Sequence, residues 1–253
     1  MRCYSKRLTM SLAAVVSLFM VLPAMAEQKP ESDGWKFGGS VYLWGAGVKG
    51  TDADGNDVDV SFSDILEDLD GGLMGGIAAR NGKWTLLADL IYLSIHQETN
   101  STVNIAGSSV KTDVDAKLKG YVSTFGAAYR IIDEDDVTLD LLGGGRYFQL
   151  DLDLDVEIGG SKSESSDSYY VLDGIVGGQV LYNLNEKWYV SCYADVGAGD
   201  SELTWQVWPG VGYRLDSVDL VAGYRHLAWK TDDGEAIDDI SFSGPMIGIK
   251  FNF

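Results

Sequence analysis

Apolar and polar side chains alternate along this chain, and the alternation is clearest in its last segment, residues 240–253 (ISFSGPMIGIKFNF). Successive side chains of a β-strand point to opposite faces, so this segment has one apolar face and one mixed face. A transmembrane β-barrel needs this pattern in every strand, because hydrocarbon covers its outside while its interior is polar. The segment therefore predicts the closing strand of a barrel, with these outward positions: Ile247, Ile249, Phe251 and Phe253.

Nine earlier segments alternate in the same way and are predicted to be strands: residues 35–48, 72–80, 84–96, 110–130, 137–154, 168–184, 188–197, 203–214 and 218–230. Short turns such as Asn81-Gly82-Lys83 mostly alternate with longer loops, which is typical of outer-membrane proteins. We therefore predict an all-β fold, a transmembrane antiparallel up-and-down β-barrel of ten strands. In this barrel the last segment pairs with residues 35–48. Eight or twelve strands remain open, because strand boundaries read from a sequence carry errors of several residues.

The first 26 residues have a different character. Arg2, Lys6 and Arg7 precede an apolar run over residues 12–22, and the small residues Ala24 and Ala26 follow it. The run is shorter than the roughly 20 residues that a membrane-spanning helix requires. Residues 1–26 are therefore predicted to be a cleaved signal peptide for export through the periplasm, and residues 27–253 a single barrel domain.

Net charge and cysteine content narrow the function further. The formal net charge is −19, and removal of the three basic residues of the leader takes it to −22. Such an acidic chain is not expected to bind nucleic acid, and its charge suits loops outside a cell. Cys3 leaves with the leader, so the single remaining Cys192 can form neither an intrachain disulfide nor a cysteine metal site.

Near the short turns, the inward positions of the strands carry charges of both signs. Buried charges are costly without partners, so charges inside a narrow lumen should pair, for example Arg130 with Asp140 and Arg146 with Asp173. We predict a structural salt-bridge network that largely plugs the lower lumen, with a selectivity filter or proton path as the alternative. The predicted network consists of Asp89, Arg130, Asp140, Arg146, Asp173 and Arg225.

Toward the long loops the outward face turns polar and the inward face turns apolar. Lys117 and Lys119 are predicted to face Asp151 and Asp153 across two strands that extend above the membrane, and the competing explanation is a β-bulge near residues 143–145. The inward side chains form either a self-filled core or a pocket for small hydrophobic ligands, and a short helix within residues 62–69, capped by Ser63, covers the mouth. The residues proposed for this upper lumen are Trp44, Leu93, Leu118, Leu150, Leu227 and Trp229.

Two groups of residues resemble chemical sites but depart from the required patterns. Residues 52–57 are similar to the start of a calcium loop, yet Asp57 stands at the glycine position and Ser63 at the position of the last glutamate. Ser94, His96 and Glu98 share an outward face, but same-face neighbours on one strand lie about 6–7 Å apart, too far for a hydrogen-bonded triad. We therefore expect no catalytic residues, no metal site and no cofactor.

Four stretches, WGAGVKG (44–50), VSFSDILEDLDGG (60–72), AARNGKW (78–84) and LADLIYL (87–93), resemble Gram-negative outer-membrane barrels of the opacity-type and OmpW-like surface proteins. The resemblance covers essentially the whole mature chain. It implies the barrel fold and the outer membrane, and it supplies no catalytic residues.

These features favour an integral outer-membrane protein with a structural or surface-antigen role and no catalytic activity. Its expected partners are outer-membrane lipid, lipopolysaccharide and the barrel-assembly machinery, which would engage the strand that ends at Phe253. One alternative is a porin-like conduit or binding site for small hydrophobic molecules. A second is a lipid-modifying enzyme that uses Ser94 and His96.

Overall fold

The computed structural model describes residues 34–52, 57–105, 108–158, 161–231 and 237–252. The predicted signal peptide, most of the acidic stretch at residues 52–57, and Phe253 lie outside the described residues. Among the described residues, no helix has the length and apolarity needed to cross a bilayer.

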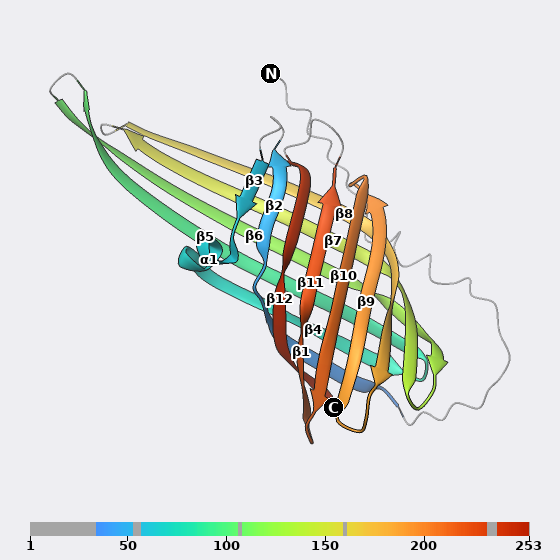
Figure 1. Ribbon diagram of the computed structural model, residues 1–253. Helices are drawn as coiled ribbons and strands as arrows, with labels where there is room; N and C mark the ends of the chain where they lie inside the picture. The colour runs from blue at the N-terminus through green and yellow to red at the C-terminus, as the bar shows by residue number, and fades with distance from the viewer. Residues whose placement is uncertain (1–33, 53–56, 106–107, 159–160, 232–236, 253) are drawn as a thin grey trace. The chain divides into compact units, whose positions relative to one another are not determined.

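Ten antiparallel strands close into a barrel, as the alternation predicted (Figure 1). Each strand pairs with its neighbour in the ring, and the first strand pairs with both the next strand and the last one. The barrel strands are β1 (Lys36–Trp44), β4 (Leu69–Asn81), β5 (Trp84–Ile105), β6 (Ser108–Asp133), β7 (Val137–Ile158), β8 (Ser161–Asn183), β9 (Trp188–Gly199), β10 (Leu203–Arg214), β11 (Val218–Lys230) and β12 (Ile237–Asn252).

The first predicted strand is interrupted. Its first part is β1, and the chain resumes as β2 (Gly47–Asp52). Strand β2 pairs with the upper part of β12 on one side and with the short strand β3 (Asp57–Val60) on the other. A helix follows, α1 (Phe62–Glu67), and its N-cap is Ser61 rather than the predicted Ser63. Ser61 accepts a hydrogen bond from the Asp64 amide (3.3 Å) and its own amide donates to the Asp64 carboxylate (3.2 Å). A capping box needs a side-chain acceptor three residues after the N-cap. Asp64 lies three residues after Ser61 and provides it.

Strands β5 to β8 are longer than predicted, β5 by nine residues and the other three by four to six. Pairing of β4 with β5 ends at Ile95, and pairing of β8 with β9 begins at Asp173, yet the four strands continue beyond these points (Figure 1). We call this extension the arm; it comprises the described residues of 96–119 and 150–172. Residues 97–109 and 155–167 lie between the predicted strands and were therefore expected to be long loops. That expectation is wrong, because both segments lie largely within the strands of the arm.

The register of β6 and β7 settles the question of the bulge. Pairing runs without interruption through residues 143–145, and Lys117 and Lys119 face Asp153 and Asp151, so the predicted extended strand is confirmed. At one of these positions only glycine fits, because a Cβ on Gly144 would overlap the carbonyl oxygen of Phe125 in β6.

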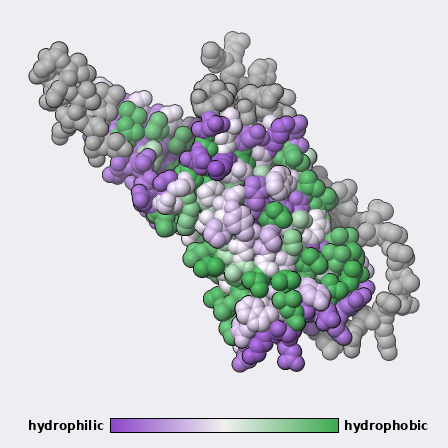
Figure 2. Space-filling view, in the orientation of Figure 1, coloured by the Kyte–Doolittle hydropathy of each residue, from purple (hydrophilic) through white to green (hydrophobic). Residues whose placement is uncertain are grey.

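The outer wall of the barrel carries an exposed apolar band. Leu43 is 70 % exposed, Ile77 69 % and Val176 64 %, although all three lie within paired strands. Figure 2 shows apolar side chains gathered over the lower part of the visible face, with polar residues at the turn end. Aromatic pairs mark both edges of the band: Trp84 with Tyr129 (5.0 Å between centroids) at one edge and Tyr92 with Tyr121 (4.8 Å) at the other.

Candidate functional site

The lumen is the candidate functional site, and its side chains form four successive layers. The first layer lies near the short turns, where Arg130 holds Asp140 through two hydrogen bonds of 2.8 and 3.0 Å. Asp140 also lies 3.6 Å from Arg80, and Arg130 donates to Asp133 at 3.0 Å. Arg130 of β6 lies opposite Asp140 of β7, so the predicted Arg130–Asp140 pair is present.

An apolar layer follows, which the sequence analysis did not predict. Ala128, Leu142 and Ile175 are buried here, and Leu87 and Tyr193 pack against them. Each of these residues occupies an inward position of its strand, so the alternation contained the signal.

Arg146 lies at the centre of the next layer and is completely buried. Its guanidinium pairs with Asp195 of β9 at 2.5 Å and donates to the Thr204 hydroxyl at 3.0 Å. Because the charge is fully shielded from solvent, this partner is essential: an isolated buried charge would cost several kcal/mol.

Asp173 lies directly opposite Arg146 on β8, as the register predicted, but the expected ion pair between them is not formed. Asp173 instead accepts a hydrogen bond from the Ser201 amide at 2.9 Å. Arg146 of β7 instead pairs with Asp195 of β9. In a closed lumen an inward side chain can contact a residue on a strand that is not adjacent to its own. Asp195 was missed, although it shares the inward face of β9 with Tyr189 and Tyr193.

Arg225 organises the other half of this charged layer. It is 3 % exposed and donates to Gln206 at 2.9 Å and to the Tyr42 hydroxyl at 3.0 Å. The Tyr42 hydroxyl in turn donates to Asp89 at 2.8 Å, and the Arg225 guanidinium lies 3.4 Å from the same carboxylate. The structure thus brings the predicted Asp89 and Arg225 into direct contact. Tyr42 bridges the two, and Gln206 contacts Arg225 alone; neither of these residues was predicted.

The upper lumen is filled by side chains that pack on one another. The rings of Phe148 and Trp229 stack with centroids 4.6 Å apart, and Phe242 meets both edge-on at 6.0 and 6.1 Å. The Arg225 guanidinium lies 4.9 Å from the Trp44 ring centroid, which joins the aromatic core to the charged layer.

Five of the six residues proposed for an apolar pocket belong to this cluster: Trp44, Leu93, Leu150, Leu227 and Trp229. Leu227 is fully buried, Trp229 is 2 % exposed and Trp44 5 %, while Leu93 and Leu150 are partly buried against them. Leu118 is half-buried on the inward face of β6, opposite Leu152 of β7. Of the two arrangements left open by the sequence, this burial favours the self-filled core.

Carboxylates and aromatic rings surround the buried arginines of the lumen. The guanidinium groups of Arg130, Arg146 and Arg225 are each engaged by carboxylates, and aromatic rings cover the two upper ones.

Comparisons with known proteins bear on the fold. No protein-family model matches the sequence, and no curated protein matches it. Among solved structures, the outer membrane protease OmpT from Escherichia coli superposes with a TM-score of 0.52 at 10 % identity, covering 88 % of this chain and 99 % of OmpT.

Two further solved structures are similar over comparable lengths. The attachment invasion locus protein Ail of Yersinia pestis matches with a TM-score of 0.34 and 13 % identity, covering 88 % of this chain and all of Ail. Neisserial surface protein A matches with a TM-score of 0.32 and 16 % identity, covering 87 % of this chain and all of its own. Together with the closed ten-stranded ring and its exposed apolar band, the OmpT likeness shows that this chain has the fold of an outer-membrane β-barrel.

Proposed function

We propose that the protein is an integral outer-membrane barrel that does not conduct solutes and that displays its arm at the cell surface. The exposed apolar band supports the membrane location. From Trp84 to Tyr92 the band spans nine residues of β5, close to the 9–11 residues of a membrane-spanning strand. At about 3.3 Å per residue this is about 26 Å along the strand, and a strand tilt of about 35–45° reduces it to a height of about 20 Å. The apolar band of known barrels is about 25 Å tall.

The closed lumen carries the proposal that the protein does not transport. The fully buried Arg146–Asp195 pair and the stacked Phe148–Trp229 rings lie in successive layers of one narrow barrel. A ten-stranded barrel has a lumen that side chains can largely fill, unlike the open channels of 16-stranded porins. A conduit for small hydrophobic molecules would require the upper aromatic layer to separate.

The arm supports a role in surface display. Its strands add a four-stranded sheet beyond the barrel wall, and Lys119 and Asp153 form an ion pair of 3.7 Å on one face of that sheet. A polar, charged sheet is suited to water rather than to lipid. The arm therefore lies outside the cell in our proposal, with both ends of the barrel domain on the periplasmic side.

A non-enzymatic role agrees with the surroundings of His96. Its Nε2 atom lies 3.0 Å from Asp115 and 3.7 Å from Glu98, and Ser94 is 3 % exposed, which leaves a lipid substrate little access to its hydroxyl. The solved structure with the highest TM-score given above is a protease, but its 10 % identity relates the two folds and not their chemistry.

Export through the predicted leader, recognition of the C-terminal strand by the barrel-assembly machinery, and contact with lipopolysaccharide complete the proposal. The resemblance to opacity-type and OmpW-like surface proteins supports the same setting. In each case the relevant surface is the barrel wall or the last strand, β12, which pairs with both β11 and β1.

Solute flux in liposomes tests the proposal directly. Vesicles that carry the refolded protein should take up small sugars and a hydrophobic fluorescent probe no faster than protein-free vesicles, because every layer of the lumen is filled. Vesicles with a known open porin provide the positive control. Size-limited sugar uptake would refute the closed lumen, and faster entry of the hydrophobic probe alone would support the conduit.

A further inference from the structure

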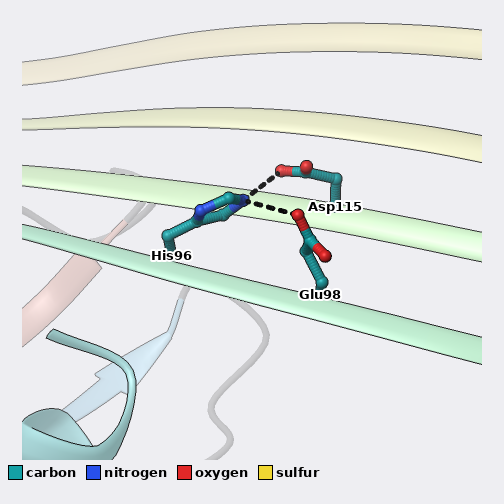
Figure 3. A group of neighbouring side chains, drawn as sticks. All are labelled: His96, Glu98 and Asp115. Carbon is teal, nitrogen blue, oxygen red and sulfur yellow. Dashed lines mark hydrogen bonds and ion pairs between the residues drawn. The ribbon is translucent and has the colours of Figure 1, made fainter. Parts of the chain in front are cut away.

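His96, Glu98 and Asp115 form a compact group on the outward face of the arm (Figure 3). His96 and Glu98 are two residues apart on β5, and Asp115 lies opposite Glu98 on β6. The His96 Nε2 atom is 3.0 Å from the Asp115 carboxylate and 3.7 Å from that of Glu98, and the three ligand atoms all lie within 4.8 Å of one another. This group is separate from the lumen, and nothing inferred from it depends on whether the lumen conducts.

These distances match those between ligands around a small divalent ion. With bonds of about 2.0–2.1 Å, neighbouring ligands of a tetrahedral zinc ion lie roughly 3.3 Å apart. The two measured distances from His96 bracket that value, so small side-chain rotations would complete the coordination. An imidazole nitrogen together with carboxylate oxygens is a donor set that suits zinc, whereas calcium and magnesium prefer oxygen alone.

The charges around the group favour a cation as well. Glu98, Asp115, Asp155 and Glu164 occupy directly facing positions on four successive strands, so like charges meet at each pairing. Like charges directly opposite each other destabilise a sheet. The same four residues line a hollow of about 230 Å³ that is open to solvent.

The lysine directly across from His96 is paired with another carboxylate. Lys117 faces His96 across the two strands, but its ammonium group lies 3.9 Å from Asp70 at the beginning of β4. Lys162 also lines the hollow and lies 3.7 Å from Glu157. The contacts of Lys117 and Lys162 are thus with other carboxylates, and His96 is the side chain that contacts both Glu98 and Asp115.

We propose that His96, Glu98 and Asp115 bind a divalent first-row transition-metal ion, with zinc as the best fit. This revises the expectation of no metal site, which rested on the incomplete calcium-like stretch and the single cysteine. That expectation took His96 only as part of a triad on its own strand. Three protein ligands leave a fourth position for water or an external ligand. The bound ion would also link β5 to β6 and offset the repulsion between Glu98 and Asp115.

Calorimetric titration of zinc into the refolded full-length chain, prepared without a polyhistidine tag, tests this proposal. We expect one high-affinity ion per chain. Loss of an outer-shell partner usually weakens metal binding by about 10–100-fold, so loss of a direct ligand in His96→Ala should weaken it by at least about 100-fold. Asp115→Asn should also weaken it. Amide hydrogen exchange in the β5–β6 segment of the arm should slow when zinc is added to the unmodified chain.

Two matched variants exclude the other soft ligands. His226→Ala removes the second histidine, which lies on β11 and contacts Ser243 at 2.6 Å. The double variant Cys3→Ala/Cys192→Ala removes both thiols of the full-length chain. Both should bind zinc as the unmodified chain does. Equal zinc binding by His96→Ala would overturn the proposal. Displacement of zinc by equimolar calcium would also overturn it, because a bare carboxylate row would then account for the binding.

Discussion

Replacing Arg146 with methionine should lower the free energy of unfolding by about 3–5 kcal/mol. Methionine has a similar length but no charge, so the Asp195 carboxylate would stay buried without its partner at 2.5 Å. Both side chains are fully shielded from solvent, which makes the remaining charge costly. Urea unfolding of the refolded barrel in detergent micelles, followed by tryptophan fluorescence, measures the loss.

Two further variants separate this mechanism from a general effect of substitution. Arg146→Met combined with Asp195→Leu should recover much of the stability, since a buried ion pair can often be exchanged for apolar side chains without loss. Lys49→Met breaks the solvent-exposed pair with Asp59 and should cost no more than about 1 kcal/mol. A cost for Arg146→Met as small as that for Lys49→Met would contradict the buried network.

Trp229→Ala should lower the free energy of unfolding by about 3–5 kcal/mol, the second large effect. The same urea unfolding experiment measures this loss. The indole is 2 % exposed and stacks on Phe148 at 4.6 Å, so its removal leaves an apolar cavity between Phe148 and Phe242. Dry apolar cavities of this kind bind small aromatic molecules. Added indole should therefore bind to Trp229→Ala and restore part of its stability.

This prediction separates a filled upper lumen from a natural pocket. The unmodified chain should show no comparable gain in stability from indole, because Trp229 occupies the space. Trp205→Ala is the matched control: that indole is 40 % exposed on the outer wall and stacks on His226 at 4.4 Å, so its removal leaves no enclosed space. If indole stabilises the unmodified chain as strongly as it does Trp229→Ala, the upper lumen is a ligand pocket and not a core.

The alternation of side chains was sufficient to predict the ring of strands and their inner and outer faces. It placed Arg130 against Asp140 and Lys117 against Asp153, because pairing between adjacent strands follows from the turn that joins them. The arm was underestimated for a related reason. Residues 161–168 are mostly serine and charged residues, which are poor strand signals alone, and they become a strand by pairing with the alternating residues of β7.

Contacts across the lumen could not be predicted in the same way. Alternation says that Arg146 and Asp195 both face inward, but it does not say which inward groups meet when a sheet curls into a closed ring. The same limit applies to Arg225, which reaches Tyr42 on β1 and Gln206 on β10 from its place on β11. His96 and Asp115 lie on adjacent strands, and their proximity follows only once the arm is recognised as paired sheet.

An outer-membrane barrel must have lipid around its outer wall. Nitroxide labels attached through Ile77→Cys and Val176→Cys, in a Cys192→Ala background, test this by paramagnetic relaxation in liposomes. We predict that both labels collide readily with dissolved oxygen and rarely with a water-soluble nickel complex, whereas a label at Asp153→Cys in the arm shows the reverse. Ready collision of the nickel complex with the labels at positions 77 and 176 would place the apolar band in water and contradict the account.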